Sequence, residues 1–68
     1  MRLIKVETNT GEETAINVDN ITTITNYRNE GVIFITLSDG ANVYTKFTSV
    51  AAAVDYIQRA PSMSMGVS

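Results

Sequence analysis

The spacing of three turn signals is the feature that most limits how this chain can fold. Residues 9–12, 29–31 and 38–40 each combine a glycine with Asn, Asp or Glu. Glycine and asparagine adopt the positive φ angles that hairpin turns require. Because the connections are this short, the segments on either side can pair only as antiparallel strands.

The segments between the turns have the alternating pattern of strands. We predict strands over residues 2–8, 13–18, 22–28, 32–37 and 42–47. The fourth is the clearest, with Ile33 and Ile35 on one face and Val32 and Phe34 making the opposite face apolar as well. A strand that is apolar on both faces is usually central in a sheet or part of an interface.

A corner and a helix complete the predicted order of elements. Residues 18–21 contain Asp19 and Asn20, whose side chains bond nearby backbone amides, and we predict a tight corner there with a single 3₁₀ turn. A helix begins at Thr48 or Ser49, which serve as caps, and Pro61 ends it. Its apolar face follows helical spacing and consists of Val50, Ala53, Val54 and Ile57.

The predicted fold is therefore mainly β, of the α+β class: a five-stranded antiparallel meander or small barrel-like sheet followed by one C-terminal helix. Residues 1–60 form a single domain, and residues 61–68 are a flexible tail without periodicity. A chain of 68 residues has a thin core. With no cysteine or histidine it has neither disulfides nor a zinc site, which leaves association of subunits as a source of stability.

The same composition argues against catalysis. The commonest general base and the strongest nucleophile are absent, and most of the seven carboxylates fall in turns. Asp19 and Asn20 offer too few oxygens for a hard cation. No glycine-rich loop leads into a helix. We expect a protein that is not an enzyme and has no cofactor and no metal.

The charge pattern bears on partners and location. The net charge is −2 and the bases form no run, which disfavours nucleic acid as the main partner. No segment has the length and apolarity of a signal peptide or a membrane span, so we expect no membrane association and a cytoplasmic protein.

Aromatic residues mark the surface where partners are expected. In the leading hypothesis the chain forms a homo-oligomer, a dimer or higher, or binds an unknown protein, because aromatic residues and Arg dominate interfaces. The alternatives are ordinary sheet packing and a small RNA- or single-stranded-DNA-binding regulator, in which bases stack on aromatic rings. The interface candidates are Tyr27, Val32, Phe34, Tyr44, Val50, Val54 and Ile57, and the nucleic-acid candidates are Lys5, Arg28, Tyr44 and Lys46.

Several motifs together resemble a known family. They are Gly11, the corner at residues 16–21, the hairpin at 33–40, the segment 43–46 and the Ser49-Val50 start of the helix. This pattern resembles the small FlbD-like proteins of bacteria over residues 1–58, and the resemblance implies the same five strands and terminal helix. That family is associated with flagella and swarming. The order of elements is also similar to that of CsrA-type RNA-binding dimers, but only in topology, since Lys46 has no basic cluster beside it.

Overall fold

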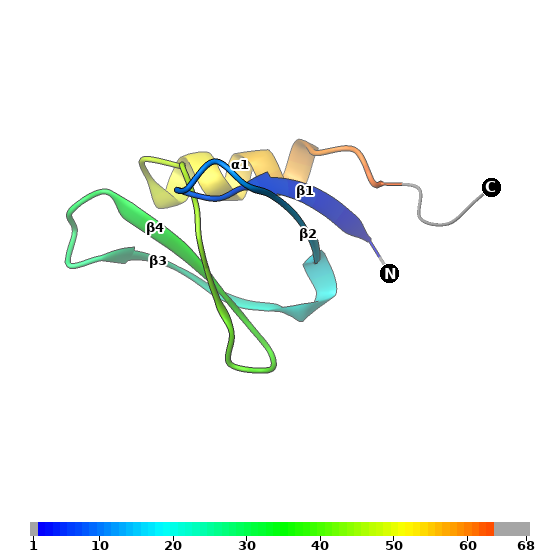
Figure 1. The fold of residues 1–68 in the computed structure, drawn as a ribbon, viewed down its shortest axis with the longest axis horizontal. Helices are drawn as coiled ribbons and strands as arrows, with labels where there is room; N and C mark the ends of the chain where they lie inside the picture. Colours follow the sequence, from blue (N-terminus) through cyan, green and yellow to red (C-terminus); the bar gives the residue numbers. More distant parts are fainter. Residues whose placement is uncertain (1, 64–68) are drawn as a thin grey trace.

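A computed structural model describes residues 2–63 of the chain, and it confirms five strands followed by one helix (Figure 1). No regular element follows the helix in residues 60–63, and the rest of the predicted tail lies outside the described residues. The elements are β1 (Leu3–Glu7), β2 (Glu13–Asn17), the 3₁₀ helix η1 (Val18–Asn20), β3 (Ile21–Tyr27), β4 (Val32–Leu37), β5 (Asn42–Tyr44) and α1 (Val50–Arg59).

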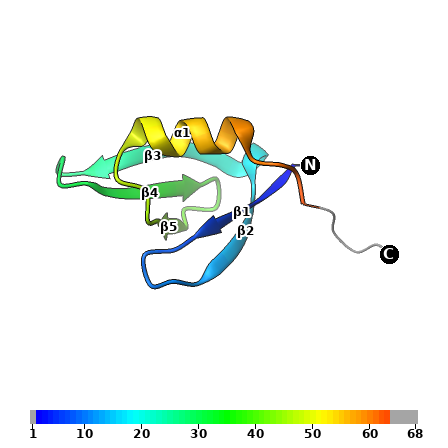
Figure 2. The ribbon, with the colours of Figure 1, turned by 90° about the horizontal axis from the view of Figure 1, so that it is seen from above.

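The five strands divide into two antiparallel sheets, β1-β2 and β3-β4-β5, and do not form one continuous meander. The sheets meet where β1 ends, because Thr8 bridges Thr45 and the Asn9 N–H donates to the Tyr44 carbonyl at 3.0 Å. This contact with β1 is why β5 ends at Tyr44 and not at the predicted residue 47. Figure 2 shows β3 at one border of the set of five strands and the β1-β2 hairpin at the other, so the strands do not close into a barrel.

The core lies between the two sheets and the helix. Side chains alternate across each strand, so Ile4, Ile16 and Ile35 turn inward, where Ile57 of α1 meets them. The remaining buried apolar residues are Val6, Ile33, Ala53 and Ala60. The Tyr56 hydroxyl donates to the Lys5 carbonyl, and Arg2 Nη2 donates to the Ala60 carbonyl at 2.6 Å. These two bonds fasten the helix to β1.

Local side-chain chemistry sets the ends of the helices. Ser49 caps α1 by accepting from the Ala52 N–H at 3.0 Å, as the sequence predicted. The corner is the predicted 3₁₀ turn, but the capping side chain is that of Asn17, which accepts from the Asp19 N–H. Among the residues that the structure describes, no helix combines the length and the apolar character needed to cross a bilayer.

Candidate interaction surface

The outer face of the three-stranded sheet is the candidate site. Strand alternation directs Ile33 and Ile35 of the central strand into the core, so their neighbours point to the opposite side. The residues of β3 and β5 that pair with those neighbours across the sheet point outward as well. All eight outward residues are uncharged: Thr23, Thr25, Tyr27, Val32, Phe34, Thr36, Asn42 and Tyr44.

Four of these residues form an apolar patch that we call the aromatic strip: Tyr27, Val32, Phe34 and Tyr44. Phe34 is central. The centroid of its ring lies 5.2 Å from that of Tyr44, its direct cross-strand partner, and 6.4 Å from that of Tyr27, its diagonal neighbour. Tyr27, Val32 and Tyr44 keep 43%, 37% and 40% of their surface exposed, whereas Phe34 is half-buried between them. Pairs at these distances stabilise the sheet, yet they leave the outer surface of the rings free for a partner.

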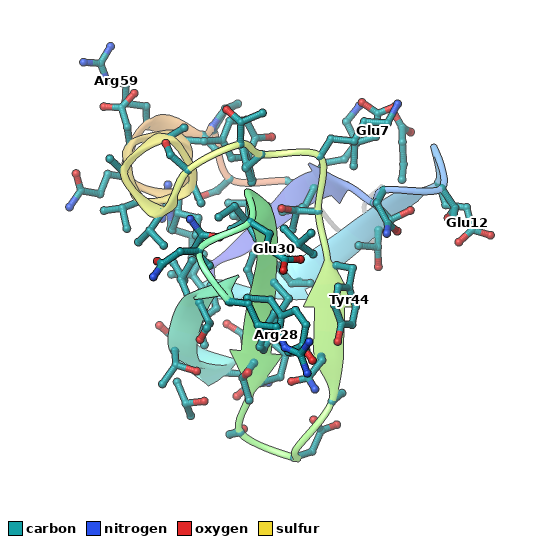
Figure 3. The ribbon with its side chains drawn as sticks, turned by 90° about the vertical axis from the view of Figure 1, so that its left-hand side faces the viewer. Glu7, Glu12, Arg28, Glu30, Tyr44 and Arg59 are labelled. Carbon is teal, nitrogen blue, oxygen red and sulfur yellow. The ribbon has the colours of Figure 1, made fainter. Side chains whose placement is uncertain are left out.

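A cation lies at one end of the strip. The hairpin turn after β3 begins with Arg28 and Asn29, at φ values of 54° and 56°, which are typical of tight hairpin turns. The Arg28 guanidinium lies 5.0 Å from the centre of the Tyr27 ring. Figure 3 shows Arg28 and Tyr44, from two separate elements, lying away from α1.

The predicted interface residues of the helix have a different environment. Ile57 is buried in the chain's own core, and Val50 is half-buried at the start of α1. Val54 alone among these three is exposed, at 36%. The helix therefore uses most of its apolar face within the molecule, and the strip is the larger exposed apolar surface.

The four predicted nucleic-acid residues do not lie together. Arg28 and Tyr44 belong to the strip and its end, but Lys5 and Lys46 line a separate hollow of about 280 Å³ with Phe47 and Tyr56. In that hollow Lys5 Nζ lies 3.3 Å from Glu13, and Lys46 Nζ lies 3.2 Å from Glu7. Each ammonium group thus faces a carboxylate, which reduces its attraction for phosphate.

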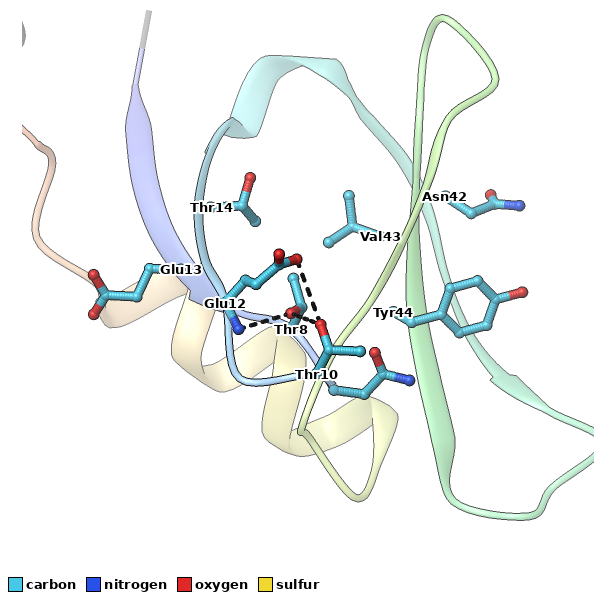
Figure 4. A pocket seen from close by; sticks show the side chains of 9 residues that line it. Thr8, Thr10, Glu12, Glu13, Thr14, Asn42, Val43 and Tyr44 are labelled. Carbon is cyan, nitrogen blue, oxygen red and sulfur yellow. Dashed lines mark hydrogen bonds between the residues drawn. The ribbon is translucent and has the colours of Figure 1, made fainter.

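A wider polar hollow of about 740 Å³ opens between the β1-β2 turn and β5 (Figure 4). The Thr8 and Thr10 hydroxyls lie 3.0 Å apart, and Thr10 lies 3.4 Å from a Glu12 carboxylate oxygen. The Glu13 side chain points away from the hollow. The sequence analysis did not predict this hollow, because it forms between two segments, residues 8–14 and 42–44, that are distant along the chain.

The chemistry available in this polar hollow is limited. Its hydroxyl groups bond within the turn, since the Glu12 N–H also donates to the Thr8 hydroxyl at 3.1 Å. Within residues 2–63 there is no group of three or more acidic, His or Cys side chains that could hold a metal. Comparison of the chain with protein-family models, with curated proteins and with solved structures found no match. The strip is thus the feature on which a function can be argued.

Proposed function

We propose that this protein is a non-enzymatic interaction module that self-associates by packing the aromatic strip of one copy against that of another. The observation that carries the proposal is the exposure of Tyr27, Val32 and Tyr44 around Phe34 on a sheet face without charge. Exposed aromatic patches of this kind are typical of protein interfaces.

Charge favours a second copy of this chain as the occupant. When two uncharged strips meet, no ion within them has to be desolvated, whereas a charged partner would lose hydration against four uncharged side chains, and a cationic one would also be repelled by Arg28 at the end of the strip. A two-fold axis through Phe34 would bring each strip against its own equivalent, which is the usual arrangement of homodimers. The small core, with eight buried apolar residues among residues 2–63, would also be extended by such a contact.

The test is the mass of the particle in solution. We expect sedimentation velocity at tens of micromolar to give a dimer or larger of the 7.4 kDa natural chain, and a particle of no more than half that size for a Tyr27→Ser, Tyr44→Ser double variant. Val54→Ser is the matched control, because it removes a similarly exposed apolar side chain from the helix. Circular dichroism checks that each variant is folded.

Two results would contradict the proposal. A natural chain that sediments as a monomer at these concentrations would show that no self-association occurs. A double variant that is folded and has the mass of the natural chain would show that the strip is not the contact. The FlbD-like resemblance over residues 1–58 and a cytoplasmic location are part of the proposal, and neither is needed for this test.

The position of Arg28 beside Tyr27 supports a second candidate function, binding of RNA or single-stranded DNA. Bases would stack on the strip while the guanidinium, 5.0 Å from the Tyr27 ring, met a phosphate. The pairing of Lys5 and Lys46 with carboxylates makes this the weaker proposal. Anisotropy of labelled random oligonucleotides at low salt decides it, because binding that weakens with added salt would support it and no binding would exclude it.

A further inference from the structure

The free edge of β3 is the second feature of this surface that calls for a partner. The Ile33 carbonyl accepts from the Thr45 N–H at 2.9 Å, so the backbone of Ile33 faces β5. The N–H and C=O groups alternate in direction along a strand, so those of Phe34 point toward β3, where Phe34 is opposite Thr25. The N–H and C=O groups of Thr25 in turn point toward β4. It follows that the N–H and C=O of Ile24, and the N–H of Asn26, point away from the sheet.

Other strand borders in the described part of the chain are protected, and this one is not. β5 has only three residues, and its outer side receives a hydrogen bond from Asn9. β2 begins with the charged Glu13. β3 has seven residues with no charge and no proline, and its pairing with β4 is regular from Thr23 onward. Charge, proline and short length are the usual means by which proteins prevent pairing at an edge.

We propose that a second copy of this chain pairs with β3 in the antiparallel sense, across a two-fold axis at Ile24. In this register Ile24 of each copy exchanges both backbone hydrogen bonds with its equivalent, and Thr23 lies opposite Thr25 of the second copy. The two three-stranded sheets become one sheet of six strands, with both aromatic strips on the same face. This contact goes beyond the proposed function, because it uses the edge of the sheet and not the strip.

Several observations favour pairing of β3 with β3 of a second copy. A strand without charge meets its own copy without like-charge repulsion, and threonine pairs across strands are favourable. Thr23 is exposed and Thr25 is half-buried, so both are accessible to a partner. Helix α1 packs on β3 (Figure 2), so an added strand would lie next to the flank of this helix.

Disulfide exchange tests both the contact and its register. The chain has no cysteine, so Thr23→Cys and Thr25→Cys each introduce a single thiol. One variant is labelled with ¹⁵N, the two are mixed in a glutathione buffer, and mass spectrometry measures mixed and homotypic disulfides. We expect the mixed disulfide to exceed each homotypic disulfide about tenfold, whereas random coupling would give about twofold. The reason is that Thr23 and Thr25 of the second copy are direct partners, about 5 Å apart, whereas two equivalent threonines are diagonal neighbours, about 7–8 Å apart.

The controls separate this contact from the strip. Thr10→Cys replaces an exposed threonine outside β3, and its mixture with Thr23→Cys should give random proportions. Repeating the experiment in the Tyr27→Ser, Tyr44→Ser background should leave the excess of the mixed disulfide unchanged. Random proportions in both backgrounds would overturn the edge pairing. An excess that is present in the natural background but absent from the Tyr27→Ser, Tyr44→Ser background would show that the edge pairing depends on the strip.

Discussion

Replacing Thr45 with valine tests how the two sheets are joined. Thr45 is the only buried polar residue in the described part of the chain, and it follows directly after β5, where the chain meets β1. Its hydroxyl donates to the Ile33 carbonyl at 2.9 Å and accepts from the Phe47 N–H at 3.2 Å. Valine has nearly the same shape but can make neither bond.

The loss in free energy of unfolding depends on which of the two partners is left without a hydrogen bond. The Ile33 carbonyl keeps the Thr45 N–H, also at 2.9 Å, so it stays satisfied. The half-buried Phe47 N–H loses the hydroxyl that accepts from it. Leaving such a donor without a partner costs about 1–3 kcal/mol, and partial access of water to Phe47 places our expectation at about 1–2 kcal/mol.

Urea unfolding followed by circular dichroism measures this change, since the chain has no tryptophan to serve as a fluorescence probe. With a slope of about 1 kcal/mol per molar urea for a small domain, the midpoint should fall by about 1–2 M. Thr48→Val is the control, because the same change at an exposed loop position should shift stability by less than about 0.5 kcal/mol. All samples need equal concentration, since association raises apparent stability. Equal midpoints for Thr45→Val and the natural chain would refute the reasoning.

Substitutions at two further positions test the helix and the core. Ser49→Ala removes the cap of α1 and should lower the free energy of unfolding by about 1 kcal/mol in the same urea assay, whereas Ser49→Gly should cost only a few tenths. An alanine variant as stable as the natural chain would show that this cap contributes nothing. Ile35→Ala removes a fully buried side chain from the central strand at a cost of about 2–5 kcal/mol, comparable with the whole stability of a domain this small. We expect most of its ellipticity to be lost at 37 °C, and a cooperative transition close to that of the natural chain would contradict the assigned core.

Features that depend on neighbouring residues could be predicted from the sequence. Alternation identified β4 from Val32 to Leu37 and placed Ile33 and Ile35 on one face, and the structure confirms both. The cap at Ser49 and the 3₁₀ turn after β2 were predictable for the same reason. In each case the energy that selects the conformation comes from groups a few residues apart, such as a hydroxyl and the amide three positions later.

The candidate surface depended on contacts that are distant along the chain. Alternation places Phe34 on the outer face, but only the register of three strands brings Tyr27 and Tyr44 to its two sides. The ion pair between Lys46 and Glu7 joins residues 39 positions apart, and it removes Lys46 from any basic patch.

The amino-acid sequence alone thus determined the elements, their order and which residues of β4 share a face, since these follow from local geometry and the period of apolar residues. The division into two sheets, the early end of β5 and the isolation of the aromatic strip from the lysines were decided only by the tertiary structure. They depend on which distant backbone groups pair, above all at the junction of Thr8 and Thr45. The energy of such pairing is a property of the folded chain and of no single segment.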